Sequence, residues 1–417
     1  MRSRTRAANG WQVATSIVVP ATDRQEWKPV LAAAAAAFGT PCYVTRCAPV
    51  VDALATVDRL ARPGLVVRSW LSFKTHPLIP LLEWWVDTGR GVEVVSECEF
   101  LTAQRLGIST DRLLVNGVAK HAWLGRHAST SLRVHFDSPA EIAALLPATI
   151  AGRWRVGIRC HAPDECDARD PRFGGQFGMT ATEAIAALRD LTEAGADVQG
   201  LHFHLGQTRQ RDDVLQRGVQ HIATLCAAAH LQPRYVDLGG GLPSAAHAGD
   251  ALVDLELAVD LATRLLPSVE EIWLENGRFI TESSTALIVR VLDVKQRDDS
   301  RYLICDGGRT NQALAADHGA HQLLVLPARG GRPVPTTICG PTCMTDDVLA
   351  RTPMPEDITA GDVIAWMDAG AYHLPWETRF SHGLCAVAWC DHTETLRLAR
   401  EREGPAQWAE RWTTAAA

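Results

Sequence analysis

Short apolar runs recur along the first two thirds of the chain, and segments of helical periodicity or high alanine content separate most of them. Near-continuous apolar strands that alternate with helices indicate a parallel sheet covered by helices. Eight such units predict a closed (β/α)8 TIM barrel. The eight predicted strands are residues 64–70, 91–96, 112–117, 132–136, 155–160, 198–206, 234–241 and 271–276.

The pattern changes after residue 280, where apolar runs alternate with turns and the helical periodicity fades. Runs such as "ALIVRVLDVKQ", "VPTTICG" and "LCAVAWCDH" read as strands. The chain therefore combines an α/β barrel with a C-terminal β-sandwich or β-barrel domain. The predicted organisation is an N-terminal segment (1–44) that packs with the β domain through a strand in "WQVATSIVVP", a barrel (45–279) and a β domain (280–417).

Composition narrows the classes of partner. A formal net charge of −7 over 417 residues, with no long basic block, argues against nucleic acid and anionic membranes. No apolar run is long enough to span a bilayer, and the start "MRSRTR" is not followed by the apolar core of a signal peptide. Eleven scattered cysteines without CxxC pairs fit reduced thiols in a cytoplasmic protein, with neither a disulfide framework nor a metal site.

Polar side chains follow most of the predicted barrel strands, at the rim where enzymes of this fold keep their catalytic residues. Side chains from different strands are expected to converge there. The polar residues are Lys74, Glu93, Ser96, Asn116, Asp137, Arg159, His202, His204, Glu275 and Arg278, and the glycine-rich turn Gly239, Gly240 and Gly241 follows one of the strands.

A lysine, a glycine-rich turn and an acid at one rim suit a particular chemistry. Bare backbone N–H groups of a glycine turn can bind phosphate. Burial lowers the pKa of a lysine and turns it into an amine able to form a Schiff base. Pyridoxal phosphate needs such a lysine, a phosphate cradle and an acid beside its pyridine nitrogen. Lys74, the three glycines and Glu275 would supply these, with His204 stacked on the ring; a solvated lysine and a turn without ligand are the alternatives.

Short motifs extend this pattern from about residue 40 to about residue 383. In the barrel they are "FKTHP", "VEVVSECE", "HFHLG", "DLGGGLP" and "ENGR", and beyond it "CDGG", "GPTCMTDD" and "DAGAY". In kind and order they resemble the barrel-type (fold type III) pyridoxal-phosphate-dependent decarboxylases, the family of ornithine and diaminopimelate decarboxylases.

The resemblance implies a role for each matching residue. Lys74 would carry the cofactor, His204 would stack on its ring and Glu275 would pair with its pyridine nitrogen. Cys343 would return a proton to the substrate carbanion after carbon dioxide leaves. In this family that cysteine comes from the second subunit, which implies a homodimer with shared active sites. The other residues that would bind the cofactor are Glu93, Arg159, Gly239, Gly240, Gly241, Arg278 and Tyr372.

Four positions depart from the family pattern: His76, Gln207, Asn276 and Met344. Gln207 replaces a serine that contacts the phosphate, which puts that contact in doubt. Met344, directly after Cys343, stands where relatives that act on diamino acids carry an acid for the distal ammonium of the substrate. A methionine cannot neutralise a desolvated cation. Asp346 is the candidate for a substitute acid.

Cationic and imidazole side chains instead surround the β-domain motifs, and guanidinium groups bind carboxylates in a bidentate manner. The run "GAYHLPWETRFSHG" resembles decarboxylases of carboxylate siderophore pathways. The expected substrate is therefore a citryl–amino acid conjugate such as citryl-diaminopropionate, and the expected contacts are Arg309, Arg379, His382, Asp346 and Met344, with Arg172 and His373 nearby.

The sequence thus predicts a homodimeric decarboxylase that uses pyridoxal phosphate for siderophore biosynthesis. Decarboxylation of free diaminopimelate, ornithine or lysine, with Asp346 as the acid, is the first alternative. A racemase of the same fold is more remote, because the β-domain motifs resemble those of decarboxylases. A non-catalytic regulator is also more remote, because Lys74 and Cys343 are both present.

Overall fold

The structure is a computed structural model that describes residues 24–127, 130–161, 175–204, 206, 213–298, 300–312 and 321–413. The described chain divides into two compact units. The barrel unit comprises residues 46–284 together with 370–375, and the β unit comprises the described residues within 1–45, 285–369 and 376–417.

Eight parallel strands form a closed barrel in the barrel unit. The last strand pairs with the first, with Val66 opposite Glu271, and this contact closes the sheet. The predicted (β/α)8 barrel is confirmed, with all eight predicted strands in place. They are β2 (Val66–Ser72), β3 (Gly91–Val94), β4 (Leu113–Val115), β5 (Arg133–Phe136), β6 (Arg155–Arg159), β7 (Asp197–His202), β8 (Tyr235–Asp237) and β9 (Glu271–Leu274).

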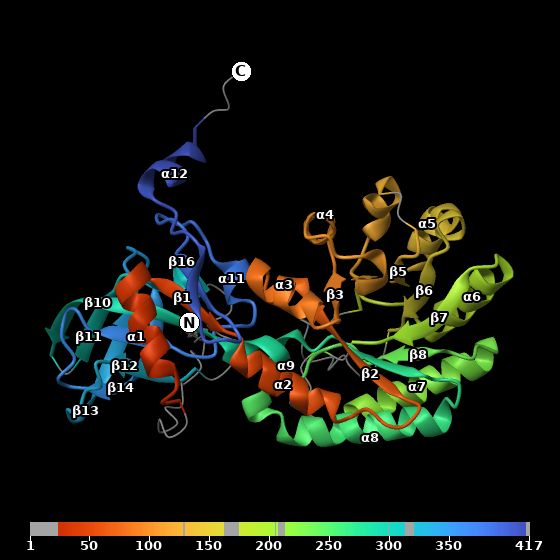
Figure 1. Cartoon of the computed structure of the whole chain (residues 1–417), viewed down its shortest axis with the longest axis horizontal. Helices are drawn as coiled ribbons and strands as arrows, with labels where there is room; N and C mark the ends of the chain where they lie inside the picture. Colours follow the sequence, from red (N-terminus) through yellow and green to blue (C-terminus); the bar gives the residue numbers. More distant parts are fainter. Residues whose placement is uncertain are drawn as a thin grey trace, which may run out of the picture. The chain divides into compact units, whose positions relative to one another are not determined.

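Helices lie outside this sheet, and Figure 1 shows α5 to α8 ranged along the outer side of the strands. Local signals explain where several of them begin. Helix α6 starts at a capping box formed by Thr180 and Glu183, and Ser138 caps α5 by accepting the N–H of Glu141. The barrel-unit helices are α2 (Ala48–Asp58), α3 (Ile79–Asp87), α4 (Glu97–Arg105), α5 (Pro139–Gly152), α6 (Ala181–Glu193), α7 (Val214–Ala229), α8 (Gly249–Leu265) and α9 (Gly277–Thr281).

Short 3-10 turns lie in several connections of the barrel unit. The turn η1 (Phe73–Thr75) comes directly after β2 and contains Lys74. The others are η2 (Thr110–Arg112), η3 (Lys120–Ala122), η4 (Leu124–Arg126), η7 (Ala245–His247) and η8 (Glu282–Ser284).

An aromatic layer fills the barrel interior. Tyr235 and Trp273 stack with ring centroids 3.5 Å apart, and Trp70 meets Trp273 edge-on at 5.1 Å. Glycines on neighbouring strands leave room for these rings, since a Cβ at Gly157 would lie 2.4 Å from the Tyr235 hydroxyl and one at Gly200 2.6 Å from its ring. The barrel is therefore a packed core, and its chemistry is confined to the rim above this layer.

The β unit is a nine-stranded sheet in the order β14-β13-β11-β10-β1-β16-β17, with β15 pairing with β10 and β12. The predicted β domain is confirmed, but β1 and β14 were not predicted, and the expected strand in residues 11–20 lies outside the described residues. The strands are β1 (Cys42–Arg46), β10 (Thr285–Arg297), β11 (Ser300–Cys305), β12 (Leu323–Leu326), β13 (Pro333–Cys339), β14 (Val348–Pro355), β15 (Val363–Trp366), β16 (Ala386–Cys390) and β17 (Leu396–Arg400).

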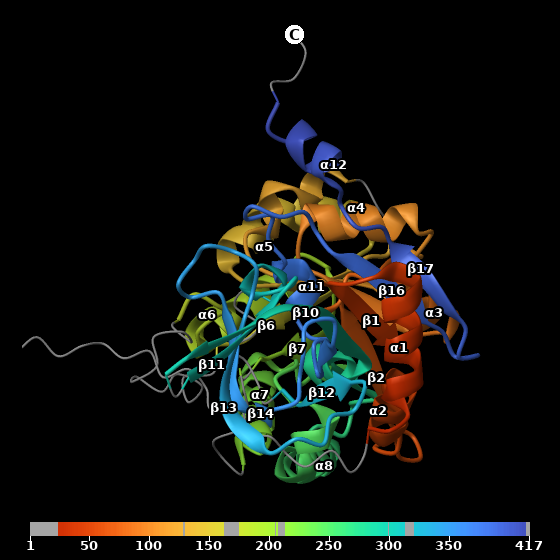
Figure 2. The ribbon, with the colours of Figure 1, turned by 90° about the vertical axis from the view of Figure 1, so that its left-hand side faces the viewer.

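One helix completes the core of the β unit. Figure 2 shows α1 (Trp27–Phe38) lying along β1 and β16, and Trp27, Leu31 and Ala34 pack there against buried residues of the sheet. The remaining helices are α10 (Arg309–Gln312), α11 (His373–Trp376) and α12 (Pro405–Glu410). Among the described residues, no helix is both long and apolar enough to cross a membrane.

Candidate active site

Lys74 and Glu93 form an ion pair at the rim of the barrel. The Nζ of Lys74 donates hydrogen bonds to both carboxylate oxygens of Glu93, at 2.8 and 2.7 Å. The pair follows from strand register, because Ser72 at the end of β2 lies opposite Glu93 on the neighbouring strand β3. The Glu93 side chain is 1% exposed, whereas that of Lys74 is 40% exposed. The lysine thus presents an accessible amine against a buried anion.

The protonation of Lys74 differs from the sequence-based expectation. Burial lowers the pKa of the lysine, as expected, but the nearby carboxylates of Glu93 and Glu275 outweigh it and raise the net pKa above its ordinary value. The expected depressed pKa is therefore wrong for the chain by itself. Lys74 is held as an ammonium, and it must lose a proton before it can act as a nucleophile.

Glu275 follows β9 and is almost fully buried, with 5% of its side chain exposed. Its backbone N–H donates to the carbonyl of Gly239 at 2.8 Å, and its Oε1 accepts a hydrogen bond from Nδ2 of Asn116 at 2.5 Å. Burial, together with the neighbouring carboxylates of Asp237 and Glu93, raises the pKa of Glu275 well above its ordinary value. A cationic partner would relieve this unfavourable charge.

His204, beyond the end of β7, is a neutral ring beside the glycine turn. Its Nδ1 accepts a hydrogen bond from the N–H of Gly240 at 3.1 Å, which places the proton of a neutral ring on Nε2. Burial, with the positive charges of Arg159 and Lys74, lowers the pKa of His204 to about 3. The ring therefore offers an uncharged aromatic face within electrostatic reach of Lys74.

The turn Gly239–Gly241 approaches other backbone too closely for any side chain. A Cβ at Gly239 would lie 2.5 Å from the carbonyl oxygen of Phe203, and one at Gly241 would lie 1.7 Å from that of Gly206. Both glycines have left-handed backbone, with φ of +65° and +100°. The turn therefore packs backbone against backbone in a way that only glycine allows.

The N–H groups of this turn are not bare, contrary to the expectation. The N–H of Gly239 donates to Oδ1 of Asp237 at 2.8 Å, and that of Gly240 donates to His204. Two of the three glycine N–H groups thus donate to side-chain acceptors. The close approach of other backbone, more than an open anion-binding nest, explains why these positions are glycine.

Arg278 and Tyr372 meet near the lysine turn, although almost a hundred residues separate them. The guanidinium of Arg278 lies 5.2 Å from the centroid of the Tyr372 ring and donates to Glu282 at 2.9 Å. The N–H of Tyr372 donates to the carbonyl of Thr75 at 2.9 Å, next to Lys74. Residues 370–375 therefore belong to the barrel unit even though strands of the β unit come before and after them in the chain.

Arg159 ends β6 with its side chain 13% exposed. Its Nη1 lies 3.6 Å from Oδ1 of Asp137, and its guanidinium lies 4.5 Å from the centroid of the Phe177 ring. Its charge also contributes to the low pKa of His204. Arg159 therefore belongs to the same rim as the other predicted cofactor residues.

Three of the predicted catalytic and substrate residues lie on one exposed loop of the β unit. Cys343, Met344 and Asp346 are exposed between β13 and β14, and Met344 is 47% exposed. The buried carboxylate of Asp347 holds this loop, accepting from the N–H of Arg309 at 2.7 Å and from the Thr342 hydroxyl at 2.6 Å. Within its own unit the loop is ordered by Asp347, while its other side chains face outward.

The arginine and histidine side chains expected to bind substrate carboxylates are less available for that role than the sequence suggested. Arg379 donates to Glu403 at 2.9 Å, and Arg411 bonds the same carboxylate. His382 is exposed and lies 2.9 Å from the Ser381 hydroxyl, whereas His373 is 1% exposed and bonds a backbone carbonyl in the barrel unit. Arg172 and Gln207 lie outside the described residues.

Sequence reasoning did not assign roles to several residues that shape this rim. Asn116 was noted only as polar, yet it binds Glu275, and Asp237 was missed although it directly precedes "LGGG". His135 lies in the apolar run "RVHF" and gave no signal beyond being a polar residue inside a strand.

Comparison with known proteins identifies the family of enzymes that this chain resembles. The model of the family "Pyridoxal-dependent decarboxylase, pyridoxal binding domain" matches residues 65–282. The diaminopimelate decarboxylase of Actinosynnema pretiosum subsp. auranticum is 30% identical over 359 residues, covering 81% of each chain. The lysine/ornithine decarboxylase of Selenomonas ruminantium is 25% identical over 321 residues, covering 74% of this chain and 80% of that one.

A solved structure shares the fold. The diaminopimelate decarboxylase from Helicobacter pylori, complexed with L-lysine, aligns with a TM-score of 0.78 at 20% identity, covering 91% of this chain and 99% of that one. The chain belongs to the pyridoxal-dependent decarboxylase family. It is an enzyme that decarboxylates an amino acid with pyridoxal phosphate as its cofactor.

The residues at the rim fit this cofactor. The accessible amine of Lys74, the neutral ring of His204 and the buried carboxyl group of Glu275 provide the donor set that it requires. The glycine turn, whose close backbone contacts leave no room for side chains, lies beside His204.

Proposed function

We propose that this enzyme removes the α-carboxylate of a free diamino acid, with meso-diaminopimelate as the first candidate and lysine and ornithine next. The observation that carries this proposal is the 30% identity to a diaminopimelate decarboxylase over 81% of the chain. The ion pair between Arg379 and Glu403 adds support, because it removes one guanidinium from the set expected to bind a polycarboxylate.

In this proposal the barrel side chains hold the cofactor. Lys74 is its attachment point, His204 stacks on its ring and Glu275 faces its pyridine nitrogen. Glu93 keeps Lys74 in place and accepts hydrogen bonds from its ammonium. The phosphate is assigned to the turn Gly239, Gly240 and Gly241 together with Arg278 and Tyr372, and Arg159 supplies positive charge at the same rim.

Pyridoxal phosphate, when bound, supplies an electron sink for the pair released as carbon dioxide leaves. The chain's own residues do the rest. The carboxyl group of Glu275, with Asn116 bonded to one oxygen, would face the pyridine nitrogen from a fixed position. Cys343 is assigned the return of a proton to the α-carbon, so that one carbon–carbon bond is broken and one carbon–hydrogen bond formed.

The distal ammonium of a diamino acid needs an anion, and Met344 cannot provide one. Asp346, two residues further on the same exposed loop, is the assigned acid. Asp347 is unsuited to the role because its oxygens already bind Arg309 and Thr342.

A second candidate substrate is a citryl–amino acid conjugate of siderophore biosynthesis. The apolar Met344 favours it, since that side chain tolerates a substrate without a distal ammonium. Arg309 and His382 would then be the remaining contacts for carboxylates.

Release of carbon dioxide distinguishes the candidates. Purified enzyme with added pyridoxal phosphate would be offered meso-diaminopimelate, lysine, ornithine and citryl-diaminopropionate at equal concentration. Turnover of a diamino acid that is lost in Asp346→Asn supports the proposal. Turnover of the citryl conjugate alone would replace it with the second candidate.

The cysteine assignment requires a homodimer with shared active sites, because Cys343 would serve the barrel of the second subunit. Mixing inactive Lys74→Ala and Cys343→Ala proteins tests this. A shared site would restore about a quarter of the wild-type activity, since half of the dimers are mixed and each has one intact site. No restoration after verified subunit exchange would rule out sharing.

A further inference from the structure

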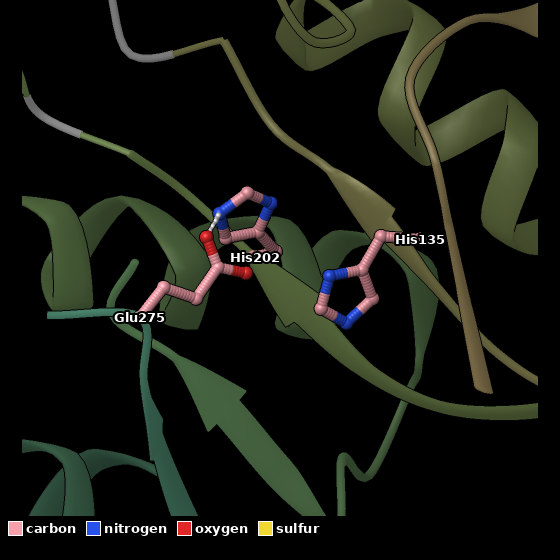
Figure 3. A group of neighbouring side chains, drawn as sticks. All are labelled: His135, His202 and Glu275. Atoms are coloured by element: carbon pink, nitrogen blue, oxygen red, sulfur yellow. Dashed lines mark ion pairs between the residues drawn. The ribbon is translucent and has the colours of Figure 1, made fainter. Parts of the chain in front are cut away.

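Two buried histidines lie behind Glu275, inside the barrel. His135 is on β5 and His202 ends β7, with 0% and 1% of their surfaces exposed. Their rings stack with centroids 5.0 Å apart and planes 17° from parallel. Figure 3 shows the carboxylate of Glu275 facing one edge of the His202 ring, where Nε2 and Oε2 are 3.7 Å apart.

This pair connects Glu275 to the aromatic layer of the barrel. On its far side His135 shares a hydrogen bond with the Tyr235 hydroxyl, with Nε2 and the oxygen 2.8 Å apart. Its other nitrogen, Nδ1, is 3.9 Å from Oδ2 of Asp237. His135 thus hydrogen-bonds Tyr235 on one side and stacks on His202, which faces Glu275, on the other.

Strand β6, between the strands that carry the two histidines, has a glycine where a side chain would collide with this group. Gly157 on β6 lies between β5 and β7, and a Cβ there would come 2.4 Å from the Tyr235 hydroxyl and 2.9 Å from Cδ2 of His135. A side chain at that position would displace the contact between the histidine and the tyrosine.

Polar atoms of this group are buried without hydrogen-bond partners. They are Nδ1 of His135 and both ring nitrogens of His202. Buried polar atoms are rarely left this way, and each costs stability that an apolar side chain would not. A barrel interior selected only for packing would hold hydrocarbon here, so the group calls for a functional explanation.

Both rings are neutral in these surroundings. Burial lowers the pKa of His135 to about 3, helped by the charges of Lys120 and Arg159, and it lowers that of His202 well below the ordinary value. A neutral imidazole donates one N–H without adding a positive charge that would compete for the carboxylate of Glu275.

The same three residues, His135, His202 and Glu275, have ligand atoms within 4.8 Å of one another, as a metal site would require. The stacking argues against a metal ion. Imidazole lone pairs lie in the ring planes, and two nearly parallel stacked rings cannot both direct them at an ion held between them. Glu275 is also already assigned to the cofactor.

We propose that His202, supported from behind by His135, is a positioning residue for Glu275. Asn116 holds Oε1 and His202 donates toward Oε2, so the carboxylate keeps the orientation that pairs with the pyridine nitrogen of pyridoxal phosphate. The 3.7 Å contact is long for a hydrogen bond, as is common in sites without ligand, and it shortens when the nitrogen is engaged. This inference rests on the role of Glu275 in the proposed function.

The test measures affinity for the cofactor rather than turnover. Full-length protein freed of cofactor is titrated with pyridoxal phosphate and with 1-deazapyridoxal phosphate, which has carbon in place of the pyridine nitrogen. His202→Phe keeps an aromatic ring but removes the donor. Its affinity for pyridoxal phosphate is expected to fall about 10-fold or more, while that for the deaza analogue changes less than about 2-fold.

Companion variants sharpen the result. His202→Gln retains a neutral donor and is expected to recover most of the affinity. His135→Phe, which removes the supporting ring nitrogens, is expected to lose less affinity than His202→Phe. Thermal unfolding of each protein without cofactor reports whether the barrel is intact.

The outcomes separate this inference from the assignment of Glu275. Equal losses for both ligands in His202→Phe, or no loss for either, would overturn the positioning role. Glu275→Gln should also discriminate between the two ligands. If Glu275→Gln discriminates and His202→Phe does not, only the present inference fails. If neither does, the assignment of Glu275 fails as well.

Discussion

Carboxyl groups meet opposite surroundings in the two units. In the barrel unit, Asp237 is buried close to Glu275 and Glu93, and burial raises the pKa of Asp237 to about 7. In the β unit, burial acts in the same direction on Glu403, but hydrogen bonds from Arg411, from the Leu384 N–H and from Arg379 lower its pKa to about 2.

This difference in the surroundings of the carboxyl groups distinguishes the candidate active site in the barrel unit from the structural ion pairs of the β unit. The barrel rim places the buried acids Asp237, Glu275 and Glu93 together, and the positive charges of Lys74 and Arg159 balance them only in part, which is unfavourable until a cationic group is bound. The β unit pairs its acids with arginines, as in Arg400 with Glu377 and Arg329 with Asp362. Strained electrostatics therefore mark the part of this enzyme where chemistry occurs.

The largest expected effect comes from removing the cation of the barrel cluster. Lys74→Ala should lower kcat at least about 1,000-fold, because the attachment point of the cofactor is lost. It should also abolish the visible absorption of the protein-bound cofactor. Activity within 10-fold of wild type would place the catalytic lysine elsewhere.

Two glycines with nearly the same backbone compare the units directly. Gly241 in the barrel has φ of +100° and Gly361 in the β unit has φ of +98°, but only at Gly241 would a Cβ meet backbone, the Gly206 carbonyl at 1.7 Å. Gly361→Ala should cost about 1 kcal/mol of unfolding free energy through backbone strain alone. Gly241→Ala should cost about 3 kcal/mol more and weaken cofactor binding.

Urea unfolding and cofactor titration of both glycine variants measure these quantities. Equal destabilisation by the two substitutions would mean that the turn has room for a side chain and that close approach does not explain its glycines.

The two carboxyl groups should give opposite pH dependence in protein without cofactor. The raised pKa of Asp237 means that its contribution to stability is present below about pH 4 and is lost as the pH rises toward 7. Asp237→Asn should therefore flatten the decline of unfolding free energy over this window, by up to about 4 kcal/mol.

Glu403 is the matched control for that experiment. Its lowered pKa stabilises the fold above about pH 4.5, and this contribution is lost as the pH falls toward 2. Glu403→Gln should change the curve only on the acid side. Identical curves for wild type and Asp237→Asn between pH 4 and 7 would contradict the raised pKa.

The smallest effect is expected at Arg379. Because it is bound to Glu403, Arg379→Ala should leave KM within about 2-fold and lower stability by less than about 1 kcal/mol. The exposed pair of Arg332 and Glu356 supplies the control, through Arg332→Ala. A large rise in KM for the citryl conjugate would restore Arg379 as a substrate contact and strengthen the siderophore alternative.

Local pattern was sufficient for the architecture. The eight barrel strands follow from apolar runs at regular spacing, and a parallel barrel brings their carboxyl ends to one rim. Lys74, Glu93 and Glu275 could therefore be expected near one another before any distance was known. The missed strand β14 contains Pro353 and Pro355, which weaken its strand signal.

What the sequence by itself determined was the barrel, the family and the types of residue at the rim, because strand period and motif order are local properties. Only the tertiary structure decided that nearby carboxylates raise the pKa of Lys74 and that Tyr372 belongs to the barrel unit. It also decided that Arg379 forms an ion pair with Glu403 and that two stacked histidines lie next to Glu275. Each of these depends on distances between residues far apart in the chain. Coulomb energies and desolvation vary steeply with such distances, and no local pattern specifies them.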